Sequence, residues 1–226
     1  MKNVENVISK FKQTLLQINK ATVTSRRNVS DIKLMAVSKT QTSEAIRPLL
    51  EKGHLVFGEN QVIEAEKKWP TLLREFSDIE LHLIGPLQAN KVKRAVGLFD
   101  VIQTVDRLKI AKKIAREAHE QNRIIECYAQ INIGEEKQKA GVSPNIADEF
   151  ISECLNESML PITGLMCIPP LGHDPRPYFD LLACIGKRNS IEKLSMGMSE
   201  DFDVAISCGA TEIRVGTGIF GTRESF

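Results

Sequence analysis

Short apolar runs alternate with amphipathic segments along most of the chain. Residues 4–21 place apolar side chains at spacings of three and four, which predicts a helix with one buried face. Further along, apolar runs predict eight buried strands, at residues 33–38, 54–57, 80–84, 100–104, 127–132, 162–168, 193–196 and 212–215. Strand starts recur at intervals of about 25 residues, enough for one strand and one crossover helix.

Eight such units predict a (β/α)8 barrel of the TIM type, an α/β fold. An open doubly wound sheet is the alternative. We expect residues 1–226 to form a single barrel domain, because a barrel of this length leaves no room for a second one. Few residues follow the last predicted strand, so we expect the helix within residues 1–24 to pack on the barrel in place of a final helix.

The first predicted strand leads directly into Lys39. In a (β/α)8 barrel the functional site lies at the carboxyl ends of the strands. A lysine there is costly to bury unless it is paired, and burial favours the neutral amine that forms a Schiff base. Lys39 is therefore a candidate nucleophile. A rim lysine bonded to a carboxylate is the alternative.

The loops after the seventh and eighth strands form the recurrent phosphate site of this fold. Here they contain Ser199 on one side and Gly216, Thr217 and Gly218 on the other. Glycines expose backbone N–H groups and the hydroxyls add further donors, so the two loops predict an anion cradle. Ordinary glycine-rich turns are the alternative.

Polar residues also follow the second and third strands. Asn60 comes after Phe57-Gly-Glu59, where a helix cap is the alternative to a site residue. His82 alternates with Leu81 and Leu83, so its ring faces away from theirs. A histidine hydrogen-bonded within the core is the alternative to a functional one.

Composition narrows the function classes. The 30 Lys and Arg residues nearly balance the 29 Asp and Glu residues, and a net charge of +1 offers no field for nucleic acid or an anionic membrane. No apolar run approaches the roughly 20 residues of a membrane span, and no secretory signal is evident. Five cysteines without a C-x-x-C motif predict reduced, mostly buried thiols in a cytoplasmic protein without a structural metal.

Lys39 and the anion cradle would become neighbours when the barrel closes, because the first strand then pairs with the last. Arg214 would sit between the two and alternates with Ile213 and Val215, so we expect it to face the barrel mouth. A phosphorylated aldehyde that forms a Schiff base fits this combination. Pyridoxal 5′-phosphate (PLP) is such a compound.

Six motifs in order resemble the pyridoxal phosphate homeostasis protein family, a single-domain relative of the alanine racemase barrel. The motifs occupy residues 36–40, 57–60, 82–91, 164–168, 195–199 and 213–221. The resemblance implies that Lys39 holds PLP as an internal aldimine and that Ser199, Gly216 and Thr217 bind its phosphate. It further implies that Arg214 approaches the pyridine nitrogen and that Asn60 and His82 line the mouth.

The resemblance also implies a carrier or regulator of PLP and amino-acid balance, with PLP-dependent apo-enzymes as candidate recipients. A PLP-dependent racemase or lyase is the alternative, with His82 as the candidate base. A third hypothesis is a lysine Schiff-base aldolase or another phosphate-binding barrel without PLP. An arginine near the pyridine nitrogen would leave the cofactor a weak electron sink, which favours the non-enzymatic carrier. We expect a monomer.

Overall fold

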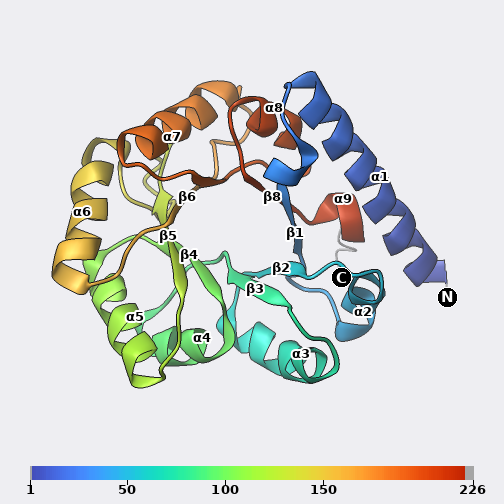
Figure 1. The fold of residues 1–226 in the computed structure, drawn as a ribbon, viewed down its shortest axis with the longest axis horizontal. Coiled ribbons are helices and arrows are strands. Elements are labelled where there is room, and N and C mark those ends of the chain that lie inside the picture. The colour runs from blue at the N-terminus through green and yellow to red at the C-terminus, as the bar shows by residue number, and fades with distance from the viewer. Residues whose placement is uncertain (1, 222–226) are drawn as a thin grey trace.

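Eight parallel strands close into a barrel in the order β1 to β8, surrounded by helices (Figure 1). The computed structural model describes residues 2–221, with side chains from residue 5 onward. Met1 and residues 222–226, which belong to the predicted domain 1–226, lie outside the described residues. The predicted (β/α)8 barrel is therefore confirmed, and the open doubly wound sheet is not what forms.

The strands are β1 (Lys33–Val37), β2 (Val56–Glu59), β3 (Glu80–Leu83), β4 (Val101–Val105), β5 (Glu126–Ile131), β6 (Gly164–Cys167), β7 (Lys193–Ser195) and β8 (Glu212–Val215). The helices are α1 (Lys2–Thr24), α2 (Ser43–Glu51), α3 (Val62–Glu75), α4 (Val92–Leu98), α5 (Leu108–Glu120), α6 (Ala147–Ser158), α7 (Arg176–Arg188), α8 (Phe202–Ser207) and α9 (Thr217–Phe220). Short 3₁₀ turns cover Val29–Asp31, Ala89–Lys91 and Pro144–Ile146.

Each predicted strand overlaps an observed one, and β2 differs most from its expected bounds. It begins at Val56 rather than His54 and runs on to Glu59. His54 instead packs edge-on between Phe11 of α1 and Phe57, with ring centroids 5.1 and 5.2 Å apart. The aromatic contacts and a hydrogen bond from His54 Nε2 to the carbonyl of Val56 hold His54 outside the ladder.

Helix α1 occupies the place of a final outer helix. It packs against α2, α8 and α9, which closes the ring of helices on that side (Figure 1). Its apolar face is buried through Val7, Phe11 and Ile18. The expectation that this helix replaces a missing last one is confirmed, because α9 spans only four residues.

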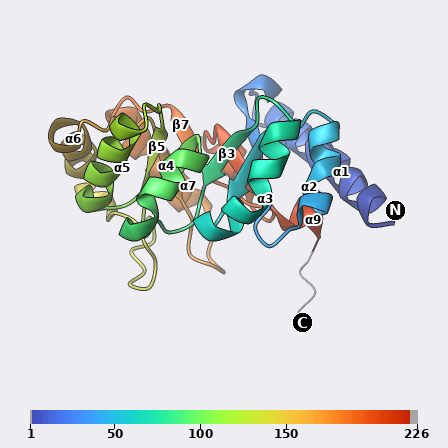
Figure 2. The same cartoon turned by 90° about the horizontal axis from the view of Figure 1, so that it is seen from below.

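The strand order places the first strand between the second and the last. Ala36 of β1 pairs with Phe57 of β2 on one side and with Val215 of β8 on the other. The segments that leave these three strands therefore emerge side by side. In Figure 2 the loops that follow β5 and β6 project from the same end of the barrel as α9, and this end is called the mouth below.

Two further expectations concern the cysteines and membrane-spanning helices. All five cysteines are free thiols, and four of them are buried while Cys184 is exposed. Among residues 2–221, no helix combines the length and the apolar character that crossing a membrane requires.

Candidate functional site

Lys39 emerges at the mouth, two residues beyond the end of β1, and its side chain is half-buried. The residue before it, Ser38, continues the strand pairing, because its N–H donates to the carbonyl of Gly58 at 2.9 Å. The backbone is therefore held against β2 up to the residue that precedes the lysine.

A second lysine holds the loop that carries the first. Lys68 of α3 is 8% exposed, and its ammonium donates to the carbonyl oxygens of Ser38 at 2.7 Å and Gln41 at 3.1 Å. It also donates to Glu64 Oε1 at 2.8 Å, and the same oxygen accepts from the backbone N–H of Thr40 at 2.5 Å. Both flanks of Lys39 are thus tied to one helix.

A buried carboxylate completes this arrangement. Glu59, at the end of β2, is fully buried, and its Oε1 accepts from Ser38 Oγ at 2.6 Å and from Trp69 Nε1 at 3.0 Å. The Lys68 ammonium lies 2.9 Å from the same oxygen. Burial raises the pKa of Glu59, and the charge of Lys68 opposes that rise. Removing Lys68 would leave the Glu59 carboxylate buried without its counter-charge.

Asn60 follows directly after β2, at the level of the mouth beside Lys39. Its backbone is packed closely, because a Cβ added to Gly85 would collide with the carbonyl group of Asn60. A glycine is therefore required where the loop after β3 crosses the loop after β2. Asn60 is half-buried, and the structure brings it to the same end of the barrel as Lys39.

The loops after β7 and β8 contact each other through Ser199. Its Oγ accepts from the backbone N–H of Gly218 at 3.2 Å. Gly197 has a φ of 92°, and an added Cβ would lie 2.6 Å from the Cβ of Ala205, so only glycine fits this turn. On the outer side, Thr14 of α1 donates to the carbonyl of Gly218 at 3.2 Å. The two loops of the predicted anion cradle therefore contact each other and α1.

Gly216 precedes α9, and Thr217 begins it with an exposed side chain. A Cβ built on Gly216 would lie 3.5 Å from Val37 of β1. The structure therefore brings Ser199, Gly216 and Thr217 to the strand exit that carries Lys39. Their hydroxyls and backbone N–H groups are donors suited to a phosphate.

Arg214 points into the barrel just below these loops and is 4% exposed. Its Nη1 donates to Ser195 Oγ and its Nη2 to the carbonyl of Cys167, each at 2.8 Å. Burial lowers the pKa of Arg214, and the negative charges of Glu212 and Asp201 oppose this. Cys167 is the last residue of β6, so the guanidinium lies near the mouth as expected.

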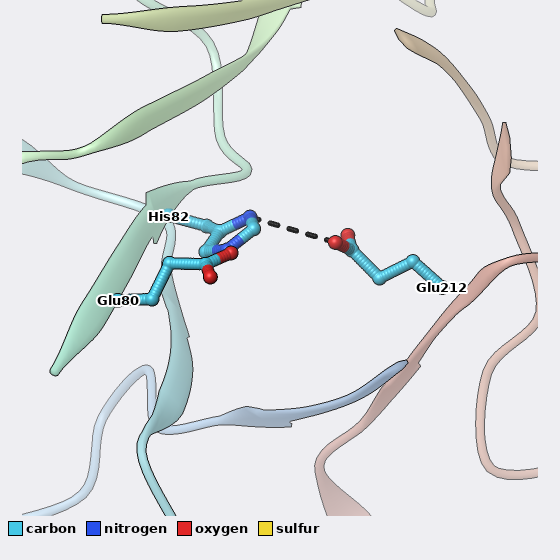
Figure 3. Close-up of side chains that lie close together, drawn as sticks. All are labelled: Glu80, His82 and Glu212. Carbon is cyan, nitrogen blue, oxygen red and sulfur yellow. Dashed lines mark hydrogen bonds and ion pairs between the residues drawn. The ribbon is translucent and has the colours of Figure 1, made fainter. Parts of the chain in front are cut away.

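His82 lies in the barrel interior and contacts residues toward the opposite end. Its Nε2 is 2.5 Å from Oε1 of Glu80, the first residue of β3. Its Nδ1 is 2.9 Å from Gln103 Nε2. The same nitrogen lies 3.8 Å from Oε2 of Glu212, the first residue of β8 (Figure 3). The His82 ring is fully buried, and β3 pairs this residue with Gly58 of β2. That His82 lines the mouth stays a prediction.

Glu80, His82 and Glu212 place possible metal-ligand atoms within 4.8 Å of one another. Both ring nitrogens of His82 already have hydrogen-bond partners, and Lys33 binds Glu80 at 2.7 Å. The His82 contact and that with Lys33 lower the pKa of Glu80 to about 2. These three residues therefore belong to a hydrogen-bonded cluster in which both ring nitrogens of His82 are engaged.

Comparisons with known proteins show which family this chain belongs to. The alanine racemase N-terminal domain family matches residues 15–224. The pyridoxal phosphate homeostasis protein of Aquifex aeolicus is 37% identical, over 97% of this chain and 99% of its own. The chain belongs to the pyridoxal phosphate homeostasis protein family.

Two solved structures place this family member among its relatives. PipY of Synechococcus elongatus, solved with PLP bound, is 34% identical to this chain, with a TM-score of 0.75. The match covers 90% of this chain and 100% of the PipY chain. Alanine racemase of Clostridium difficile, at 16% identity, has a TM-score of 0.71 and covers 98% of this chain but 58% of its own. The second likeness is one of fold.

Sequence reasoning overlooked the residues that support the mouth from inside the barrel and from α3. Gln103 and Thr104 are the polar residues of the otherwise apolar strand Val101–Val105, and a glutamine in such a strand is a readable signal of a buried polar contact. Lys68 and Glu64 are spaced like an ordinary surface pair on a helix. Their burial against the lysine loop is visible only in the fold.

Proposed function

We propose that this chain binds PLP at the barrel mouth and acts in intracellular PLP and amino-acid homeostasis. In this proposal Lys39 holds the aldehyde carbon as a Schiff base, and Ser199, Gly216 and Thr217 bind the phosphate. Arg214 faces the pyridine nitrogen, and Asn60 lines the pocket. PLP supplies an aldehyde that reacts with primary amines.

One observation carries the proposal: β1, which presents Lys39, lies next to β8, whose exit forms the anion cradle with Ser199. An amine and a set of phosphate donors thus meet at one rim, with a buried guanidinium below them. The PLP bound to PipY supports PLP as the ligand of this chain.

The proposed role is that of a carrier without catalytic turnover. Arg214 can only donate hydrogen bonds, so it does not favour a protonated pyridine nitrogen. Racemisation also needs a base on each face of the cofactor. Tyr128 lies inside the barrel against Gly164, where burial raises its pKa, and Tyr178 lies on the outer helix α7. His82 is engaged in the interior cluster.

Three expectations accompany this role. PLP-dependent apo-enzymes are the candidate recipients of the cofactor, the working form is a monomer, and the location is the cytoplasm. The free thiols support the last of these, since such cysteines are usual in a reducing compartment.

The decisive experiment is the visible absorption spectrum with PLP, recorded for the wild type, Lys39→Ala and the control Lys52→Ala, an exposed lysine that caps α2. The expected result is a visible band in the wild type and the control and its loss in Lys39→Ala. Absence of a band in the wild type with excess PLP would contradict the proposal. Borohydride trapping of a sugar phosphate would then favour an aldolase-like barrel.

Turnover is tested separately by proton exchange at Cα of a panel of amino acids in deuterated water. The carrier proposal expects no exchange beyond that of free PLP. Multiple-turnover exchange that disappears in His82→Ala would establish the racemase or lyase alternative instead.

A further inference from the structure

Arg214 is connected to the interior cluster through a chain of buried side chains. Ser195 Oγ accepts from Arg214 Nη1 at 2.8 Å and donates to Gln103 Oε1 at 2.7 Å. Gln103 Nε2 then faces His82 Nδ1 at 2.9 Å and donates to Glu212 Oε1 as well. Each of these side chains is at most 4% exposed, so water does not compete for the contacts.

The donors and acceptors admit one arrangement of protons. Arginine can only donate, so the hydroxyl of Ser195 must accept from Arg214 and place its single proton toward Gln103. The amide oxygen of Gln103 accepts that proton, which leaves both amide N–H bonds for His82 and Glu212. His82 Nδ1 therefore accepts, and its own proton is on Nε2, directed at Glu80. A flipped amide would place its oxygen against the carboxylate of Glu212.

We propose that Gln103 is a positioning residue that fixes Arg214 relative to the cofactor and sets the tautomer of His82. The inference rests on the proposed function, because a displaced Arg214 would change the contact that this residue makes with the pyridine end of PLP. Because Gln103 takes the hydroxyl proton, the lone pairs of Ser195 Oγ are held toward the guanidinium. Without that acceptor the hydroxyl is free to rotate, which weakens one of the two contacts that orient Arg214.

Charge explains why an amide occupies this position. Gln103 touches Glu212 on one side and, through Ser195, the positive Arg214 on the other. A carboxylate at position 103 would be adjacent to Glu212, and two like charges in the interior repel strongly. An apolar side chain would leave Ser195, His82 and Glu212 Oε1 without their shared partner. Glutamine satisfies all three without adding a charge.

The test compares Gln103→Leu and Gln103→Glu with Thr104→Val. Thr104 is the next residue on β4, and its buried hydroxyl donates to the carbonyl of Gly85. Thr104→Val therefore also removes a buried hydrogen bond, but one that is not connected to Arg214. Ser195→Ala is the second route, since it removes the middle link with little change in volume. The readouts are the wavelength and pH titration of the visible PLP band and the affinity for PLP.

The expected result is a shifted band and an affinity about 3- to 10-fold weaker in the Gln103 variants and in Ser195→Ala, with neither change in Thr104→Val. If Gln103→Leu fails to fold, the comparison of Ser195→Ala with Thr104→Val tests the proposal. Unshifted bands and unchanged affinity in all folded variants, with a normal wild-type band, would overturn this inference alone. A wild type without any band would overturn the proposed function, and this inference with it.

Discussion

The ammonium of Lys68 donates a hydrogen bond of 2.7 Å to the carbonyl oxygen of Ser38, the residue immediately before Lys39. A lysine that is buried on α3 thus positions the backbone of a lysine that is presented at the mouth. The charge of the buried lysine is compensated by Glu59 and Glu64, at 2.9 and 2.8 Å. One cationic side chain therefore links β1, β2 and α3 at the rim.

Replacing Lys68 should be costly. Lys68→Met leaves Glu59 buried without its counter-charge and frees two backbone carbonyls, so we expect a loss of about 3–5 kcal/mol in the free energy of unfolding. Lys67→Met is the matched control, because Lys67 is the exposed neighbour on the same helix. Urea denaturation followed by circular dichroism measures both. Equal stability of the two variants would show that the buried contacts contribute nothing.

Gly197 should tolerate no side chain. Gly197→Ala combines a left-handed backbone with a collision against Ala205, whereas Gly209→Ala has a φ of 99° but open space around the new Cβ. We expect the control to lose about 1–2 kcal/mol from backbone strain and Gly197→Ala to lose more. We also expect weaker PLP binding only in Gly197→Ala, since this turn leads into Ser199. Thermal denaturation and PLP titration separate the two effects.

Stability should fall at mildly acidic pH because of His54. Burial lowers the pKa of His54 to about 4 from an ordinary value of 6.5, so the unfolded chain binds the proton more readily than the folded one. The stability this residue contributes at neutral pH is therefore lost progressively as pH falls from 6.5 to 4. Between pH 7 and 4.5 the loss amounts to about 2 kcal/mol. It shows as a lower midpoint of urea denaturation.

The control for this pH effect is His54→Phe, which keeps a ring between Phe11 and Phe57 but cannot titrate. Its unfolding free energy should depend less steeply on pH over the same interval. A slope identical to that of the wild type would assign the acid sensitivity to other groups.

Thiol reactivity should be confined to one position. Cys184 is exposed on α7, while burial raises the pKa of Cys167 to about 12 and that of Cys154 to about 12. A thiol reagent added to the folded protein should modify one cysteine quickly and the others only after denaturation. Cys184→Ser should abolish the fast phase. A fast phase that persists in this variant would contradict the burial of the remaining thiols.

Much of the architecture can be predicted from local patterns in the sequence. Eight buried strands, each followed by a segment that crosses back, have few ways to satisfy their backbone hydrogen bonds other than a closed parallel barrel. The exits of strands are also readable from sequence, so Lys39, Asn60 and the two glycine-rich loops could be assigned to one end. Alternation along β8 likewise predicts that Arg214 faces inward, since Ile213 and Val215 pack beneath the helices.

The remaining features depend on distances between strands far apart in the sequence. His82 could be assigned to the inner face of β3, but its height within the barrel follows from strand register, which pairs it with Gly58 of β2 and Val101 of β4. Gln103, Ser195 and Arg214 form one hydrogen-bonded chain only because barrel closure brings β4, β7 and β8 around a common interior. Lys68 looks like a surface residue until α3 packs over the loop of Lys39. Local patterns thus decide which residues face the mouth or the core, while closure of the barrel decides which of them touch.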